Sequence, residues 1–192
     1  MKRNTLIIFD CFGVVTSEIA PVWFATRFPP EEAARIKDQY FHGADRGTKT
    51  IGALLDEMSE GLSLPKETII SEWKAIFSIN TELLEIIKEL SAEYHIALLS
   101  NAPRGIVEAI FVTYELYPLF DKVFISSHYC MAKPDREFYE VCVNSFAAME
   151  KIYMIDDNIS NLIDLETLGI KPHLFTSNEE LLLYLREEKL LP

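Results

Sequence analysis

The sequence predicts an α/β fold with a doubly wound parallel sheet, and two observations carry this prediction. Short apolar runs alternate along the chain with amphipathic stretches of helical length. The first run, Leu6–Phe9, is apolar at every position, which is typical of a strand covered on both faces by helices. Strands that alternate with helices form βαβ crossovers, and these crossovers produce a parallel sheet.

Five runs have the length and composition of buried strands. They are Leu6–Phe9, His95–Leu99, Lys122–Ile125, Ile152–Ile155 and Lys171–Phe175. The amphipathic stretches between and after them predict helices. These stretches are Asn80–Glu93, Arg104–Leu116, Pro134–Ala147, Asn161–Leu168 and Asn178–Arg186. We therefore expect residues 1–15 and 81–192 to form the core domain.

Residues 16–80 separate the first strand from the second and are too many for one crossover. They predict three helices, over Glu31–Phe41, Thr50–Met58 and Lys66–Phe77, with turn signals at Gly43, Gly47 and Gly61. A helical cap domain inserted there would cover the carboxyl end of the first strand as a lid. The alternative is a structural subdomain that makes no contact with the functional site.

Composition excludes several classes of partner. The 192 residues carry a net charge of −12, which argues against nucleic acid and against an anionic membrane surface. No apolar run reaches the length of about 20 residues that a membrane span needs. Cys11, Cys130 and Cys142 show no metal-binding spacing, and we expect buried free thiols in a cytoplasmic protein. The protein is expected to be a monomer or a homodimer.

Chemistry-bearing residues follow the predicted strands at four places. Asp10 follows the first strand, and Ser100 and Asn101 follow the second. Lys133 precedes a predicted helix, and Asp156 and Asp157 follow the fourth strand. Together they offer a carboxylate that can attack an electrophile, hydrogen-bond donors for an oxyanion, a cation, and oxygen ligands for Mg²⁺.

Each of these places also has a structural explanation. Asp10, Ser100 and Asn101 suit turns or helix caps, Lys133 suits a solvated surface, and Asp157 or Asn158 suits a helix cap. The four strand ends, however, meet at one edge of a doubly wound sheet. Their coincidence there favours a functional site over four independent caps.

The motifs that carry these residues resemble those of the haloacid dehalogenase-like (HAD) superfamily. They read FDCFGVV, LLSNA, SSHYCMAKPDREFYE, and IDDNISNL followed by LGI. The resemblance covers nearly the whole chain. The paired acids and the short helical insertion are similar to the small-capped subfamily that includes the phosphatase domain of soluble epoxide hydrolases and sugar-phosphate phosphatases.

The resemblance implies a Rossmann-like core and a role for each motif. Asp10 would be the nucleophile, Ser100 would bind the transferred group with Asn101 beside it, and Lys133 would steady nucleophile and intermediate. Mg²⁺ would be held by Asp10, the backbone carbonyl of Phe12 and Asp157. Asp156 would ligate the ion or one of its waters.

Phe12 departs from the family pattern. In the family's phosphatases the residue two past the nucleophile is an aspartate that moves protons, and phenylalanine cannot do so. A positioned acid–base group typically raises the rate by about 10²–10⁴-fold. Without one, roughly 3–5 kcal/mol of the expected lowering of the activation barrier is unaccounted for.

Three functions fit these residues. The first is Mg²⁺-dependent phosphoryl transfer from a small phosphorylated metabolite with an unusual acid. The second is haloacid dehalogenation, since those enzymes carry an aromatic residue, tyrosine, at the position of Phe12. The dehalogenases lack the paired acids at the fourth motif, however. The third is a binding or regulatory protein that has lost catalysis.

The predicted cap offers further candidates of lower specificity. Arg46 or Lys49 could reach a remote anionic group of the substrate if their loop faces the cleft, although a solvated loop is the alternative. Trp23, Phe24, Phe28 and Tyr40 could line a pocket or pack between helices. His42 and His128 lie outside the motifs and receive no role.

Overall fold

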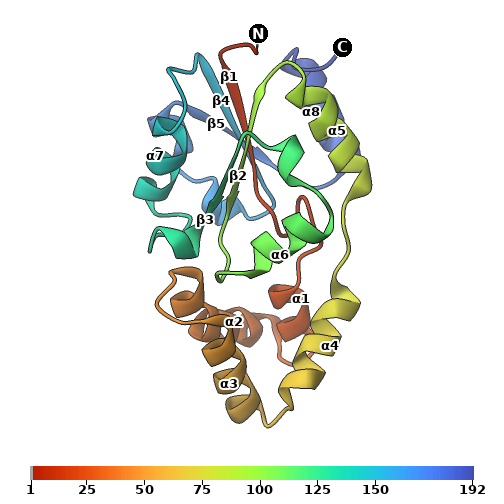
Figure 1. Ribbon diagram of the computed structural model, residues 1–192, viewed down its shortest axis with the longest axis vertical. Coiled ribbons are helices and arrows are strands. Elements are labelled where there is room, and N and C mark those ends of the chain that lie inside the picture. Colours follow the sequence, from red (N-terminus) through yellow and green to blue (C-terminus); the bar gives the residue numbers. More distant parts are fainter. Residues whose placement is uncertain (1) are drawn as a thin grey trace.

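A five-stranded sheet forms the centre of the structure (Figure 1). The computed structural model describes residues 2–192. Neighbouring strands are all parallel and run in the order β3-β2-β1-β4-β5. The strands are β1 (Thr5–Phe9), β2 (His95–Ser100), β3 (Lys122–Ile125), β4 (Lys151–Asp156) and β5 (Ile170–Leu174). The predicted α/β fold is therefore confirmed.

The strand order places a topological switch beside β1. From β1 the chain builds outward to β2 and β3, and it then returns to build β4 and β5 on the other side. Phe9 is in register with Leu98 of β2 and Ile155 of β4. Ligands of open α/β sheets bind outside the carboxyl ends of strands at such a switch. Asp10 and Asp156, the next residues along β1 and β4, lie side by side there.

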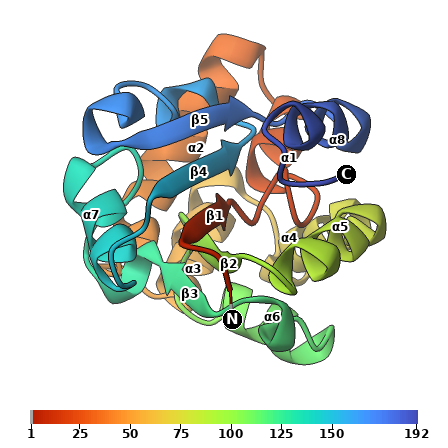
Figure 2. The ribbon, with the colours of Figure 1, turned by 90° about the horizontal axis from the view of Figure 1, so that it is seen from above.

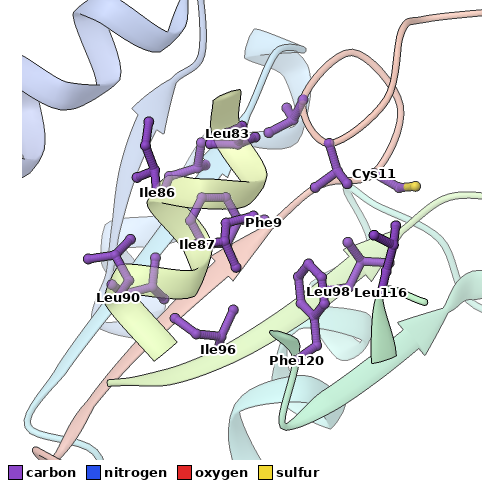
Figure 3. Close-up of a cluster of buried hydrophobic side chains, with 14 of the residues drawn as sticks. Phe9, Cys11, Leu83, Ile86, Ile87, Leu90, Ile96, Leu98, Leu116 and Phe120 are labelled. Carbon is purple, nitrogen blue, oxygen red and sulfur yellow. The ribbon is translucent and has the colours of Figure 1, made fainter. Parts of the chain in front are cut away.

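Helices cover both faces of the sheet, which explains the continuous apolar runs. Ile7 and Phe9 pack on one face in a cluster with α5 and α8, and Figure 3 shows this cluster around Phe9. Leu6 and Ile8 point to the opposite face and pack against α7. Figure 2 shows α7 on one side of the sheet and α5 and α8 on the other. The covering helices are α5 (Thr81–Ser91), α6 (Ile106–Thr113), α7 (Arg136–Asn144) and α8 (Asn178–Glu187).

Four helices between β1 and α5 gather at one end of the sheet (Figure 1). They are α1 (Ala20–Ala25), α2 (Pro30–Asp45), α3 (Ile51–Leu62) and α4 (Lys66–Ile76). They have their own hydrophobic cluster, in which Trp23, Phe24 and Met58 are buried. We call these four helices the cap. The division of the chain into two domains at residues 16–80 stays a prediction.

The helices differ from the sequence prediction in two places. α1 was not predicted, because its six residues are too few for a visible period, although Pro21 suits a first helical turn. The helix predicted over Asn161–Leu168 is wrong. The structure has the short 3₁₀ helices η3 (Ile159–Asn161) and η4 (Leu165–Leu168) there, separated at Asp164, whose φ of +60° interrupts a right-handed helix.

Turns and thiols need smaller corrections. Gly43 and Gly61 lie inside α2 and α3, so only Gly47, with φ of +70°, marks a turn as predicted. Cys11 and Cys142 are buried as expected, but Cys130 is exposed. Among residues 2–192, no helix combines the length and the apolar character that crossing a bilayer requires.

Candidate active site

A cavity of about 490 Å³ lies between the carboxyl edge of the sheet and the cap. Asp10, Lys133 and Asp157 line it at the sheet edge, Lys37 and other cap residues line it as well, and Glu18 lines it from the segment that leads to α1. A volume of this size suits a small molecule. Asp10, Asn101, Lys133 and Asp157 therefore share one cavity with a set of cap residues, whereas Ser100 and Asp156 are buried outside its lining.

Three carboxylates converge beside this cavity, and two of them, Asp10 and Asp157, line it. Oxygen atoms of Asp10, Asp156 and Asp157 all lie within 4.8 Å of one another. A Cβ atom on Gly13 would lie 2.0 Å from Oδ2 of Asp157, so the glycine leaves room for this carboxylate. The φ of Gly13 is +79°, a conformation that favours glycine. The turn after β1 is thus shaped around the acid that follows β4.

The ammonium group of Lys133 holds two of these acids. Its Nζ lies 2.9 Å from Oδ1 of Asp10 and 2.6 Å from Oδ2 of Asp156. The lysine side chain is fully buried, and burial alone would lower its pKa. The charges of the two carboxylates outweigh burial and raise the pKa of Lys133, so they favour its charged form.

Asp10 is held through one of its two oxygens. Oδ1 accepts a hydrogen bond of 2.6 Å from the backbone N–H of Cys11, and the same oxygen contacts Lys133. Oδ2 is the oxygen left for an electrophile or a cation. Burial raises the pKa of Asp10 well above its ordinary value; Lys133 opposes the shift, and Asp156 adds to it.

Asp156 and Asp157 have opposite surroundings. Asp156 is fully buried and accepts hydrogen bonds from the backbone N–H of Asn158 at 2.9 Å and from Nδ2 of Asn161 at 3.1 Å. Asp157 lines the cavity, where burial and the charge of Asp156 raise its pKa. Asp156 therefore anchors Lys133 and the loop after β4, and Asp157 offers its oxygens to the cavity.

The donor set fits a divalent metal ion. All of the ligand atoms are carboxylate oxygens, which Mg²⁺ prefers. Burial is the largest cause of the raised pKa values of Asp10 and Asp157, so their charged forms need compensation from positive charge. A cation near both would supply that compensation. Phe12 also lines the cavity, and a role for its backbone carbonyl as a metal ligand stays a prediction.

Asn101 and Ser100 occupy different places. Asn101 lines the cavity, and its side chain donates to the carbonyl of Lys133 and accepts from the N–H of Lys133, both at 2.8 Å. It thereby fixes the backbone that carries the lysine. Ser100 is fully buried, and its Oγ has no hydrogen-bond partner among residues 2–192. A role for Ser100 in binding a transferred group stays a prediction.

Of the substrate-contact candidates predicted in the cap region, only Arg46 lines the cavity. The guanidinium of Arg46, however, makes a two-pronged ion pair with Asp135, at 2.6 and 2.9 Å. Lys49 pairs with Glu57 and is outside the lining. The four aromatic residues proposed as pocket walls pack inside the cap instead, where Trp23 and Phe24 are buried.

Several residues that line the cavity were not predicted from the sequence. Glu18, Lys37 and Trp73 line the cavity from the cap or the segment that leads to it. None of them follows a predicted strand, so no sequence signal distinguished them from surface or packing residues. Asn161 was also missed, because it was assigned to a helix; its signal was the repeated polar spacing Asp156, Asn158, Asn161.

The comparison with protein families gives one match. The family described as haloacid dehalogenase-like hydrolase matches residues 5–169. A curated relative, drimenol cyclase drtB of Aspergillus calidoustus, is 30% identical over 83 residues. That similarity covers 43% of this chain and 16% of the relative's length.

Solved structures share the fold over nearly the whole chain. A predicted HAD-like family hydrolase from Porphyromonas gingivalis has a TM-score of 0.76 at 20% identity, covering 98% of each chain. The HAD family enzyme bt-2542 from Bacteroides thetaiotaomicron, in complex with magnesium and inorganic phosphate, has a TM-score of 0.71 at 20% identity, covering 91% of this chain and 95% of that one. L-2-haloacid dehalogenase from Xanthobacter autotrophicus has a TM-score of 0.62 at 16% identity, covering 100% of this chain and 85% of that one.

Proposed function

Because the chain belongs to the haloacid dehalogenase-like hydrolase family, we propose that it is a Mg²⁺-dependent phosphatase of a small phosphorylated metabolite. The observation that carries the proposal is the contact of Lys133 with Asp10 and Asp156 beside the open carboxylate of Asp157. This arrangement supports the proposal, because the proposed nucleophile Asp10, the cation Lys133 and the proposed metal ligand Asp157 line one cavity. Phosphoryl transfer depends mainly on such positioning and on electrostatic stabilisation.

Asp10 is the nucleophile of the proposed reaction. The N–H of Cys11 and the ammonium of Lys133 hold Oδ1, which fixes the orientation of the carboxylate and leaves Oδ2 for attack on phosphorus. The ammonium of Lys133 contacts Asp10 at 2.9 Å, and its proposed role is to stabilise the negative charge of the transition state. Asn101 and Asp156 act through Lys133, since they hold its backbone and its ammonium.

Asp10, Asp157 and the backbone carbonyl of Phe12 would hold the Mg²⁺, and Asp156 would bind the ion or one of its waters. When bound, Mg²⁺ supplies positive charge that offsets the carboxylates and the phosphoryl oxygens. The fold-mate bt-2542 in complex with magnesium and inorganic phosphate supports this choice of ion and substrate class. The proposed role of Ser100 is to hydrogen-bond the transferred group through its Oγ, which has no partner among residues 2–192.

Hydrolysis of an aryl phosphate tests the proposal. We expect turnover of p-nitrophenyl phosphate with Mg²⁺, loss of turnover with EDTA, and loss of turnover in Asp10→Asn. Asp164→Asn is the matched control, because it removes an exposed carboxylate from the loop between η3 and η4. Metal-independent turnover, or equal rates in the wild type and Asp10→Asn, would contradict the proposal.

A haloacid dehalogenase is the second candidate, and Phe12 and the fold of the Xanthobacter enzyme favour it. The converging carboxylates Asp10, Asp156 and Asp157 argue against it, because they add negative charge where a halide must leave. Chloride release from 2-chloropropionate without metal would establish this candidate. Metal-dependent binding of beryllofluoride with no turnover on a broad panel of phosphate esters would instead indicate a protein that binds without hydrolysing.

A further inference from the structure

The cavity contains a carboxyl group that the proposed function does not use. Glu18 lines the same cavity as Asp10, Phe12 and Asp157. It lies in the short segment that leads from the turn after β1 to α1. Phe12 also lines the cavity, at the position where the family pattern places an acid, and its side chain has no proton to transfer. The carboxyl group of Glu18 therefore lines the same cavity as Phe12, the position at which the family's acid is absent.

The segment that carries Glu18 is fixed on both sides. Thr16 pairs with Phe12 and with Ile79, which lies after the last cap helix. The backbone N–H of Ser17 donates to the carbonyl of Ser78 at 2.9 Å, and Oγ of Ser17 donates to the carbonyl of Ile76 at 3.0 Å. The two connections between sheet and cap are therefore tied together at the residue before Glu18.

The Glu18 side chain is also oriented locally. Its Oε1 accepts a hydrogen bond of 3.1 Å from the N–H of Ile19. Because only one carboxyl oxygen is engaged there, the other remains available for proton transfer. A catalytic group held by its own backbone segment keeps its position when the substrate enters.

The electrostatic surroundings of Glu18 suit proton transfer near neutral pH. Burial raises its pKa to about 7, and the charge of Asp157 contributes to the rise. Lys37 of the cap and Lys133 of the sheet edge oppose the shift. A group with a pKa near the working pH can donate a proton in one step and accept one in the next. Burial is the largest cause, so the shift does not depend on repulsion by Asp157 alone.

The other titratable cap residues in the cavity fit this role less well. Asp45 has a pKa raised to about 6 by burial, but the charges that act on it are those of Lys37, Asp38 and Arg46, all on α2 or at its end. His42 and Asp38 are exposed. Glu18 is the cap-side acid on which both Asp157 and Lys133 act.

We propose that Glu18 is the general acid–base catalyst of this protein and takes the place of the acid that Phe12 cannot supply. This proposal rests on the proposed phosphatase function. In the first step Oδ2 of Asp10 bonds to phosphorus, the bond from phosphorus to the leaving oxygen breaks, and Glu18 gives its proton to that oxygen. The products are an alcohol, an aspartyl phosphate and the Glu18 carboxylate.

The second step restores both residues. A water oxygen bonds to phosphorus, and Glu18 takes a proton from that water. The bond from phosphorus to Asp10 breaks, which releases inorganic phosphate and returns the Asp10 carboxylate. Over the two steps one phosphate ester and one water give one alcohol and one phosphate, so Glu18 ends with the proton that it had at the start.

Rapid-quench kinetics of Glu18→Gln on two substrates tests the proposal. p-Nitrophenolate leaves without a proton, so the variant should keep a burst of about one p-nitrophenol per protein and then turn over about 10²–10⁴-fold more slowly than wild type. With β-glycerol phosphate, whose alkoxide needs a proton, the burst itself should disappear. Glu89→Gln, which removes an exposed glutamate of α5, should behave as wild type on both substrates.

Three outcomes would overturn the proposal, and they are distinguishable. A wild-type protein that hydrolyses neither substrate would overturn the phosphatase function and the role of Glu18 together. Normal wild-type turnover with an unchanged Glu18→Gln variant would overturn the role of Glu18 alone. Loss of Mg²⁺-dependent beryllofluoride binding in Glu18→Gln would show that the residue supports the structure of the site. Retained binding with the burst pattern above would support the proposal.

Discussion

The two walls of the cavity differ in how their charges are held. On the sheet wall, Lys133 contacts Asp10 at 2.9 Å and Asp156, which is buried next to the cavity, at 2.6 Å, and at most 10% of each side chain is exposed. On the cap wall, Lys37 pairs with the exposed Asp38 at 3.1 Å, and Glu18 is only partly buried. The sheet wall is a closed network, and the cap wall is a set of separate groups.

This difference separates two tasks. A network of buried, mutually paired charges holds reacting groups in one geometry and is costly to alter. Partly exposed groups on a helical cap can change with little effect on the fold. We infer that the sheet wall defines the type of reaction, and that the cap wall supplies the proton donor and the contacts with the rest of the substrate.

The largest difference between the walls is expected in turnover. Asp10→Asn should lower kcat by at least about 10³-fold, because it removes the nucleophile. Asp45→Asn, which removes a partly buried carboxylate of the cap wall, should change kcat by less than about tenfold. Steady-state hydrolysis of p-nitrophenyl phosphate measures both. Losses of equal size would show that the two walls share the chemistry.

The free energy of unfolding should also distinguish the sheet wall from the cap wall. Lys133→Met leaves Asp10 and Asp156 buried without their cation, and such a loss costs about 3–5 kcal/mol of unfolding free energy. Lys37→Met removes a partly exposed cation from α2 and should cost less than about 1 kcal/mol. Urea unfolding in EDTA at neutral pH measures both variants. A similar cost for the two lysines would contradict the closed network.

Magnesium affinity should depend on the sheet wall alone. Asp157→Asn is expected to weaken Mg²⁺ binding by at least about 10–100-fold, the range that even indirect metal contacts contribute. Asp38→Asn on the cap wall should leave the affinity within about twofold, because long-range effects of exposed charges are screened. Isothermal titration calorimetry with Mg²⁺ gives both constants. An unchanged affinity in Asp157→Asn would remove Asp157 from the ligand set.

The pH dependence of stability gives a smaller effect at the cap wall. Since burial raises the pKa of Glu18 from 4.5 to about 7, the folded state binds this proton more tightly than the unfolded state. The contribution of Glu18 is therefore lost as pH rises through about 7. Urea unfolding in EDTA should show Glu18→Gln close to wild type at pH 4 and more stable than wild type at pH 8. A difference that does not vary with pH would exclude a raised pKa.

The ion pair that joins the cap region to the sheet domain should contribute least to the free energy of unfolding. Arg46 of the cap and Asp135 before α7 form an ion pair in which 30% of each side chain is exposed. Arg46→Gln should lower the unfolding free energy by less than about 1 kcal/mol. A loss above about 2 kcal/mol in urea unfolding would mean that this pair holds the cap onto the sheet.

The sheet wall was predictable from the sequence because strand ends have a fixed place in a parallel sheet. The apolar runs before Asp10 and Asp156 defined β1 and β4, and the register then brought both acids together. Lys133 was proposed as a site residue from its motif, and in the structure it contacts Asp10 and Asp156, while its catalytic role stays a prediction. Here the position of each residue at the end of its strand determines which residues lie close together in the sheet.

The cap wall was not predictable in the same way. The site position of Glu18 depends on hydrogen bonds between two connections that are about 60 residues apart, such as that from Ser17 to Ser78. No local sequence pattern predicts a hydrogen bond between residues so far apart in the chain. Asn161 was missed for a related reason, since its amide reaches Asp156 from a 3₁₀ turn that the apolar spacing presented as a helix.

Direct detection of a phosphoryl group on Asp10 tests the central claim most closely. The protein would be mixed with p-nitrophenyl phosphate and Mg²⁺, quenched in acid, reduced with borohydride and digested for peptide mass spectrometry. An aspartyl phosphate is reduced to homoserine, so we predict homoserine at position 10 in the wild type, more of it in Glu18→Gln, and none in EDTA. Phosphate release with Asp10 unmodified in every sample would contradict the account.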